Sequence, residues 1–267
     1  MKNSLEYDLL SGLIVQWIKK YVNGKGITTL VVGVSGGIDS AVVSTLCALT
    51  GIETIVVNIP IKSNKTNTNL SALHCKYLSE NHQNVKVITV DLSDEYDMLA
   101  NKLGEATKDA RKHNHDLANA NMKSRMRMLT LYRIAGVNSG IVVGTGNKVE
   151  DFGIGFFTKY GDGGVDISPI ADLTKTQVRE LGRSLGVCKE IIEAKPTDGL
   201  WEDDRTDESQ IGASYEELEW AMWAIDNDKC FKEMTERQIK VIEIYRDYNT
   251  RNNHKMIPIP VFKVEHE

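Results

Sequence analysis

The eight residues 33–40 carry the strongest chemical signal in this chain. They have the sequence G-V-S-G-G-I-D-S and lie between an apolar run at 29–32 and a helix-compatible run at 41–47. A strand, a Gly/Ser loop and a helix in this order let backbone N–H groups and a helix N-terminus hold phosphate. Asp39 adds a carboxylate where a metal that bridges phosphates would bind. The loop lacks the lysine of a Walker A sequence, so it indicates another kind of phosphate loop.

A second group of chemically capable residues lies at 155–166, with the sequence G-F-F-T-K-Y-G-D-G-G-V-D. Glycines at this density suit a backbone folded tightly against a ligand. The aromatic rings can stack on a heterocycle, and Lys159 can meet a phosphate or a carboxylate. Asp162 or Asp166 can accept hydrogen bonds from an amide or a ribose. Taken alone, the segment is also compatible with a turn-rich hairpin.

The predicted helix at about 116–135 contributes a third candidate. Asn121 and Arg125 are four residues apart and therefore share a face. The neighbouring stripe, formed by Met122, Met126 and Leu129, is expected to pack inward. A solvated basic helix above a methionine core stripe is the alternative.

Glu150 is the candidate for a second metal-binding carboxylate. It follows Gly144-Thr145, which closes a predicted strand at the sheet edge where the 33–40 loop also lies. Two carboxylates and triphosphate oxygens suit Mg²⁺, which prefers few protein ligands. Taken alone, Glu150 fits a surface position better than a metal site.

The elements that must position these residues alternate along the chain. Strands are predicted at about 28–34, 54–59, 85–90 and 139–144, and helices at about 3–22, 41–50, 70–78, 92–104, 116–135, 214–225 and 231–248. Such alternation predicts an α/β fold with a doubly wound, mostly parallel sheet flanked by helices, and with its ligand at the carboxyl edge. The polar, acidic stretch at 196–212 is predicted to be a long loop that acts as a lid.

Composition bounds the class of protein. A chain of 267 residues, 41% hydrophobic and 26% charged, predicts one globular domain over 1–267. Its net charge of −5 argues against nucleic acid as a partner. No apolar run approaches the length of a membrane span, and none of the four cysteines forms a C-x-x-C pair. We therefore expect no membrane partner and a reducing, cytoplasmic location.

The motifs together resemble a known family. S-G-G-I-D-S resembles the pyrophosphate loop of enzymes that cleave ATP to AMP and pyrophosphate. With N-x-K-x-R-x-R, G-T-x-x-x-x-E, G-F-F-T-K-Y-G-D-G-G-x-D, L-T-K and P-T-x-x-L in this order, the chain resembles bacterial NAD synthetases from about residue 10 to Lys255. The segment F-F-T-K-Y-G-D-G-G is close to diagnostic. The implied fold is Rossmann-like, of the adenine nucleotide alpha hydrolase kind.

The resemblance also assigns roles to residues. It implies contacts to ATP phosphates from Gly33, Val34, Ser35, Gly36, Gly37, Ile38, Asp39 and Ser40, and further ATP contacts from Thr145, Lys175 and Thr197. It implies Mg²⁺ ligands at Asp39 and Glu150. It implies contacts to deamido-NAD from Arg125, Lys159, Asp166, His254 and Lys255, the last two in what otherwise resembles a solvated tail.

The family makes NAD from deamido-NAD, ATP and an amino donor. The nicotinate carboxylate is expected to attack the α-phosphorus of ATP, and ammonia then displaces AMP from the adenylated carboxylate. Lys159 and Lys175 can neutralise charge, while Asp162 is our candidate to position or deprotonate ammonia. Glutamine-using relatives carry an additional amidohydrolase domain, for which this chain has no room, so free ammonia is the expected donor. Family members are homodimers, and the helices at 3–22 and 116–135 can form that contact or a monomer core.

Two segments of two residues each depart from the family pattern. Gly146-Asn147 replaces a frequent Asp-His pair, and Asp198-Gly199 interrupts the usual P-T-A-D-L. Two other classes of function remain as alternatives. One is a related amidating or thiolating enzyme, such as the synthetase half of GMP synthetase or a tRNA-modifying enzyme. The other is a nucleotide-binding regulatory module of the universal-stress or electron-transfer-flavoprotein kind, which has no need of a second metal carboxylate.

Overall fold

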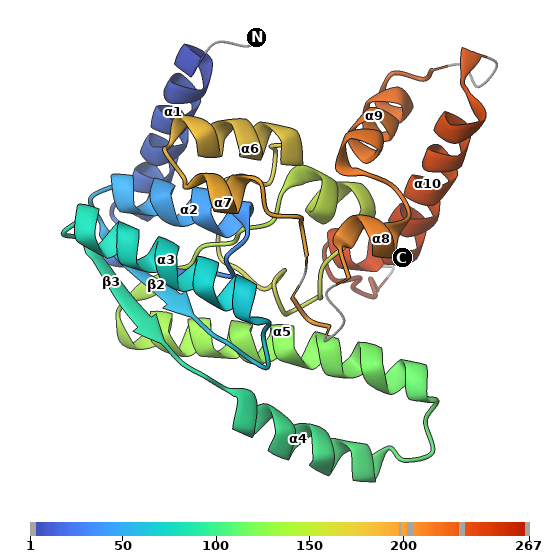
Figure 1. Cartoon of the computed structure of the whole chain (residues 1–267), viewed down its shortest axis with the longest axis horizontal. Helices are drawn as coiled ribbons and strands as arrows, with labels where there is room; N and C mark the ends of the chain where they lie inside the picture. Colours follow the sequence, from blue (N-terminus) through green and yellow to red (C-terminus); the bar gives the residue numbers. More distant parts are fainter. Residues whose placement is uncertain (1–3, 198, 202–204, 230–232, 265–267) are drawn as a thin grey trace.

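A parallel sheet lies at the centre of the computed structural model, which describes residues 4–197, 199–201, 205–229 and 233–264 (Figure 1). Within these residues the strands are β1 Thr29–Gly33, β2 Glu53–Asn58, β3 Val85–Thr89 and β4 Gly140–Val142, in the order β3-β2-β1-β4. Thr29 of β1 pairs with Glu53 of β2 on one side and with Gly140 of β4 on the other. The chain thus moves outward from β1 to β3 and returns to the far side of β1. This reversal makes the carboxyl ends of β1 and β4 the switch point of the sheet, the place where folds of this kind bind their ligands.

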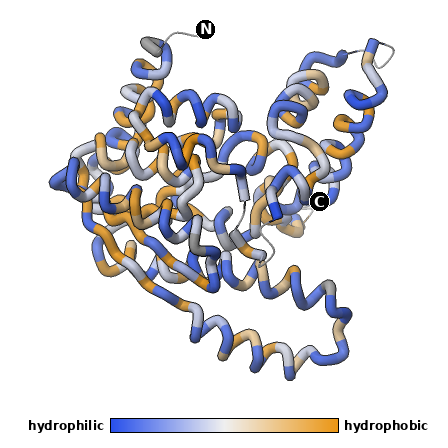
Figure 2. The backbone as a smooth tube through the Cα atoms, viewed as in Figure 1, coloured by the Kyte–Doolittle hydropathy of each residue, from blue (hydrophilic) through white to orange (hydrophobic). Residues whose placement is uncertain are grey.

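Helices cover both faces of the sheet, which confirms the doubly wound α/β prediction. One face carries α1 Ser4–Val22, α2 Ile38–Leu49, α3 Lys65–Asn81, α6 Lys175–Ser184 and α7 Lys189–Ile192, and the other carries α4 Ser93–Ala106 and α5 Lys112–Val137. Leu30 and Val32 pack toward α2, while Val31 packs toward α5. Because both faces are covered, the two central strands β1 and β2 are buried along most of their length, and their middle residues are apolar, whereas the edge strand β3 carries Lys86 and is mostly exposed (Figure 2).

The remaining elements build a third layer of packing beside the sheet. They are the π-helix η1 Val149–Ile154, α8 Asp207–Ile211, α9 Tyr215–Asp226 and α10 Glu236–Met256. Their apolar side chains, including Val149, Ile154, Leu218 and Ile242, form a hydrophobic cluster of their own. Residues of η1 therefore belong to a different packing unit from residues of α2.

Several sequence predictions need correction. The last helix runs to Met256, so His254 and Lys255 belong to its final turn rather than to a tail. The segment 196–212 is not a continuous loop, because α8 lies within it; residues 198 and 202–204 of that segment lie outside the described residues. Met122 and Met126 pack inward as predicted, but Leu129 is 67% exposed.

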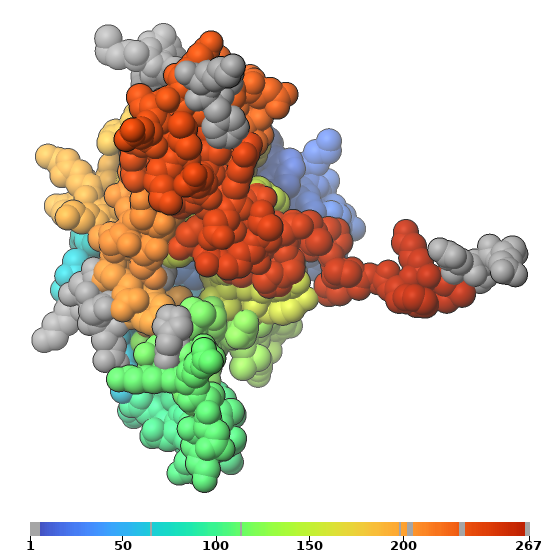
Figure 3. Space-filling model, turned by 90° about the vertical axis from the view of Figure 1, so that its right-hand side faces the viewer, coloured from blue at the N-terminus to red at the C-terminus, as the bar shows by residue number. Residues whose placement is uncertain are grey.

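Beyond α10 the chain continues as an extended arm, Ile257–Val264, which projects from the body in Figure 3. Its apolar side chains are exposed, from 43% at Ile257 to 91% at Phe262. Within the described residues, no helix is long and apolar enough to cross a membrane.

Candidate active site

The 33–40 loop joins β1 to α2 as predicted, and its own side chains hold its shape. The Ser40 hydroxyl accepts a hydrogen bond from the Ser35 N–H at 3.2 Å and donates to the Gly37 carbonyl at 3.0 Å. Gly36 has a φ of +88°, and a Cβ at this position would lie 2.5 Å from the Asn67 carbonyl oxygen. Gly37 is the N-cap residue of α2 and caps it without a side chain. The N-terminus of α2 is therefore open to an anion.

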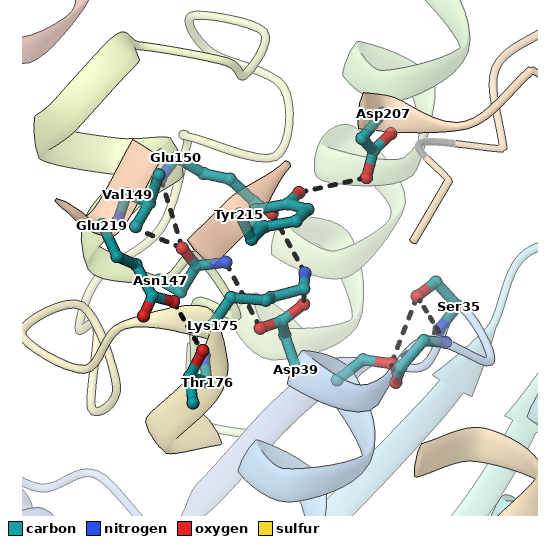
Figure 4. Close-up of polar contacts among 12 residues, drawn as sticks. Ser35, Asp39, Asn147, Val149, Glu150, Lys175, Thr176, Asp207, Tyr215 and Glu219 are labelled. Atoms are coloured by element: carbon teal, nitrogen blue, oxygen red, sulfur yellow. Dashed lines mark hydrogen bonds and ion pairs between the residues drawn. The ribbon is translucent and has the colours of Figure 1, made fainter. Parts of the chain in front are cut away.

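Lys175 lies at the centre of a charged cluster beside this loop (Figure 4). Its Nζ is 2.5 Å from Asp39 Oδ2 and 3.0 Å from Glu150 Oε1. The hydroxyl of Tyr215 donates to Glu150 Oε1 at 2.5 Å and to Asp207 Oδ2 at 3.2 Å. These side chains come from α2, η1, α6, α8 and α9. The cluster thus joins the sheet edge to the third layer.

Burial determines the electrostatics of this cluster. The Lys175 side chain is only 5% exposed. Burial alone would lower the pKa of Lys175, but Asp39 and Glu150 together raise it above its usual value. Burial likewise favours a raised pKa for Glu150, but Lys175 and the Tyr215 hydroxyl lower it overall. The lysine is consequently charged at neutral pH and paired with the ionised carboxylate of Glu150, whereas burial raises the pKa of its other partner, Asp39.

The two carboxylates fit a magnesium site in chemistry and placement. Asp39 and Glu150 converge on one point of positive charge, Lys175 Nζ, at the open N-terminus of α2. Mg²⁺ uses few protein oxygens and completes its shell with phosphate and water. Among the described residues no group of three or more His, Cys, Asp or Glu side chains is arranged to hold a metal.

A third carboxylate, Asp151, explains the unusual glycine at 146. A Cβ on Gly146 would lie 2.1 Å from Asp151 Oδ2, so the aspartate occupies the space that a side chain at 146 would need. Burial, with Glu150, Asp162 and Asp39 nearby, raises the pKa of Asp151 to about 8. Asn147, which follows Gly146 in the same departure from the family pattern, is fully buried and donates to Asp39 Oδ1 at 3.4 Å.

The glycine-rich segment forms a turn held by α5. Asp162 Oδ1 accepts hydrogen bonds from Ser124 Oγ at 2.7 Å and from the Thr158 N–H at 2.9 Å. Thr158 in turn donates to Asn121 Oδ1 at 2.6 Å, and Arg125 donates to the Lys159 carbonyl at 3.3 Å. Asn121 and Arg125 therefore share a face, as predicted, and that face holds the turn.

The C-terminal turn of α10 holds the other side of the same segment. Lys159 Nζ donates to the His254 carbonyl at 2.5 Å. Lys255 Nζ donates to the carbonyls of Gly155 and Phe157 at 2.9 and 2.8 Å. Asp166 lies further on, where its carboxylate accepts hydrogen bonds from the Val142 N–H and the Tyr132 hydroxyl. The predicted contacts of these residues to deamido-NAD remain predictions.

Two candidates remain, Thr145 and Thr197. Thr145 follows β4 at the switch point, and Thr197 accepts a hydrogen bond from the Gly199 N–H at 3.2 Å. Sequence reasoning missed Tyr215, Asp207 and Asp151. Ser214 and Glu217 form a capping box, so S-Y-E-E did mark a helix start and could have drawn attention to Tyr215.

Comparison with known proteins gives consistent results. The family model described as NAD synthase matches residues 11–258. The NH₃-dependent NAD⁺ synthetase of Alkaliphilus oremlandii is 38% identical over 92% of this chain and 94% of its own length. The one from Mesoplasma florum is 38% identical over 92% and 95%. The structure of NMN synthetase from Francisella tularensis covers 99% of this chain and 100% of its own, with a TM-score of 0.82 and 29% identity.

Proposed function

The chain belongs to the NAD synthase family, and we propose that the cluster around Lys175 is its ATP and magnesium site. The protein is an ammonia-dependent NAD synthase, a ligase that uses ATP to amidate deamido-NAD to NAD. One observation carries the site assignment. Asp39 and Glu150, from separate packing units, meet at a buried cation beside the open N-terminus of α2.

In the first step the nicotinate carboxylate oxygen attacks the α-phosphorus of ATP, and pyrophosphate leaves. The reaction requires positioning and charge neutralisation more than a protein nucleophile. The N-terminus of α2, which has no side-chain cap, binds the phosphates. Lys175 supplies a fixed positive charge, and Asp39 and Glu150 would hold Mg²⁺. When bound, Mg²⁺ neutralises charge on the phosphate oxygens and favours departure of pyrophosphate.

In the second step ammonia attacks the adenylated carboxylate, an amide bond forms and AMP leaves. Asp162 is the candidate to receive the proton, since its second carboxylate oxygen, Oδ2, accepts no hydrogen bond from the turn that holds Oδ1. The candidate deamido-NAD contacts are Arg125, Lys159, Asp166, His254 and Lys255. Residues 196–212 remain our candidate cover, and Lys123 Nζ ties the Leu200 carbonyl to α5 at 3.0 Å. An Asp162→Asn enzyme with normal ammonia-dependent turnover would remove Asp162 from this scheme.

A mononucleotide is the second candidate substrate. The specific observation is the likeness, over nearly the whole chain, to a protein named for NMN synthesis. Nicotinate mononucleotide carries the same ring carboxylate as deamido-NAD and lacks only the adenylyl half. Competition between the two substrates gives the ratio of their kcat/KM values. A higher kcat/KM for deamido-NAD would support the dinucleotide as the substrate, and a higher value for nicotinate mononucleotide would support the mononucleotide.

We also propose a cytoplasmic homodimer. The exposed apolar side chains Leu9, Leu13 and Trp17 recur every four residues on α1 and form a stripe suited to a second copy. The thiols of Cys47, Cys75 and Cys188 are free, which suits a reducing compartment. Sedimentation of Leu13→Asp protein beside wild type tests the dimer.

The decisive experiment incubates pure protein with ATP, MgCl₂, deamido-NAD and ammonium, and measures NAD and pyrophosphate together. We expect equal amounts of both products, and the loss of both in Asp39→Ala protein. Replacing ammonium with glutamine tests the donor. Equal NAD production by Asp39→Ala would contradict the assigned site.

A further inference from the structure

Three side chains on one face of α10 meet the carboxyl-terminal end of η1. Asn249 Nδ2 donates to the Gly153 carbonyl at 2.7 Å, and Asn252 Nδ2 donates to the Ile154 carbonyl at 2.9 Å. Lys255 Nζ continues the series at Gly155 and Phe157. The donors recur every three residues, so they lie along one face of the helix. We call them the α10 donor row.

The π-helix η1 needs such partners. It is only six residues long, and the last carbonyls of any helix have no partner within it. Its end folds back on itself: Gly155, with a φ of +61°, donates its N–H to the Glu150 carbonyl, and Phe156 donates to the same oxygen at 3.0 Å. The backbone of Glu150 thus closes the turn that Asn249 and Asn252 hold from outside.

The two helices also approach closely. A Cβ on Gly155 would lie 2.5 Å from Asn252 Cβ, and a Cβ on Gly153 would lie 3.3 Å from Tyr245 Cε2, both of them on α10. The packing therefore leaves room for glycine alone at 155, and it brings the Asn252 amide within reach of the Ile154 carbonyl.

We propose that Asn249 and Asn252 are positioning residues for the metal site. Asp39 is fixed by α2 in the sheet core, whereas Glu150 is fixed by η1 in the third layer. The separation of their carboxylates depends on how η1 is held, and the α10 donor row holds it. This inference rests on the proposed role of Glu150 as a metal ligand.

The test compares three isosteric changes on α10. Asn249→Asp and Asn252→Asp each replace an amide donor by a carboxylate that repels the carbonyl. Asn253→Asp makes the same change of charge at the adjacent exposed position and serves as the matched control. Hydrogen exchange of residues 149–157 and Mn²⁺ affinity in the presence of ATP are measured for each, after thermal unfolding has established that each folds.

We expect amide exchange at 149–157 to rise about tenfold in the Asn249 and Asn252 variants. We expect their Mn²⁺ dissociation constant to rise about tenfold, at the low end of the effect of removing a direct partner of a metal ligand, because these amides act on Glu150 through the backbone of η1. The control should match wild type in both. Exchange and affinity equal to those of the control would overturn the proposal.

Two further variants separate the possible failures. Wild-type Mn²⁺ affinity in Glu150→Gln protein would overturn the metal assignment on which the inference rests. Weakened binding by Glu150→Gln beside normal binding by Asn252→Asp would overturn the positioning role alone. If Asn252→Asp does not fold, Asn249→Leu removes the neighbouring hydrogen bond without adding charge and takes its place in both measurements.

Discussion

The proposed site has two parts that are built in different ways: the cluster around Lys175, proposed to bind ATP and called here the nucleotide half, and the glycine-rich turn 155–166 with its contacts, proposed to bind deamido-NAD and called here the acyl half. In the nucleotide half, the functional side chains of Asp39, Glu150 and Lys175 contact one another. In the acyl half, Arg125 and Lys159 instead contact main-chain carbonyls. The first arrangement fixes charges in place before substrate arrives, whereas the second fixes the path of a turn. Changes in the nucleotide half should therefore impair the chemical step, and changes in the acyl half should mainly weaken binding.

Replacing Lys175 with methionine should have the largest effect. It leaves two largely buried carboxylates facing each other without their cation. We expect the free energy of unfolding to fall by about 3 kcal/mol and the first-step rate to fall by about 100- to 1,000-fold. Urea unfolding and single-turnover pyrophosphate release measure the two. Lys189→Met, at an exposed ion pair on α7, is the control and should change neither. Pyrophosphate release at the wild-type rate by Lys175→Met protein would contradict the statement that Lys175 supplies a fixed positive charge for the first step.

Acid should destabilise the folded protein through His74, which lies on α3 and contacts Ser44 of α2. This buried side chain, 2.9 Å from Ser44 Oγ, has its pKa lowered by burial from 6.5 to about 4. Between these values the unfolded chain binds the proton and the folded protein does not. Stability is therefore full above pH 6.5 and falls as the pH drops toward 4, by about 3 kcal/mol at most. Urea unfolding across this range checks the slope, and His74→Gln should flatten it. An equal slope in that variant would assign the pH dependence elsewhere.

Gly36→Ala tests whether the phosphate loop needs its close approach to α3. The new Cβ would meet the Asn67 carbonyl oxygen at 2.5 Å, in a backbone conformation with φ of +88°. We expect a loss of about 2 kcal/mol in stability and a higher KM for ATP. Gly186→Ala has a comparable φ of +72° with nothing within 4 Å, so it isolates the conformational part of the cost. Equal losses in both variants would show that the approach to Asn67 does not matter.

Arg125→Ala should have the smallest effect and a different character. The Arg125 guanidinium holds the Lys159 carbonyl from an exposed position. We expect the KM for deamido-NAD to rise about tenfold, with the KM for ATP and kcat little changed. Arg133→Ala, two turns along α5 and exposed, is the control. A fall in kcat at unchanged KM in Arg125→Ala protein would contradict the prediction that changes in the acyl half mainly weaken binding.

The strands and the phosphate loop could be predicted because their signals are local. Leu30, Val31 and Val32 form a continuous apolar run, which a parallel strand buried on both faces requires. Glycine and serine at 35–37 mark the loop directly. The convergence of Asp39, Glu150 and Lys175 followed from the family pattern, and parallel topology brings their segments to one edge.

Other features have no signal of this kind. A π-helix of six residues has no side-chain periodicity that distinguishes it from a loop, so η1 was missed. The sequence R-N-N-H-K at 251–255 is polar throughout and resembles a tail, but its Asn252 and Lys255 stabilise the last turns of α10 by tertiary contacts. Leu129 follows the expected spacing but lies on the exposed side, because periodicity alone does not define which stripe faces the sheet.

The overlap between Gly146 and Asp151 has an evolutionary consequence. Because a Cβ at 146 would collide with the carboxylate of Asp151, the two positions cannot both carry large side chains in this backbone arrangement. A lineage that acquires one must first lose the other, or change both together. Across homologues we expect the two positions to covary, with a bulky residue at 146 accompanied by a small one at 151. Transplanting the Asp-His pair of other synthetases into this scaffold should accordingly succeed only with Asp151 removed.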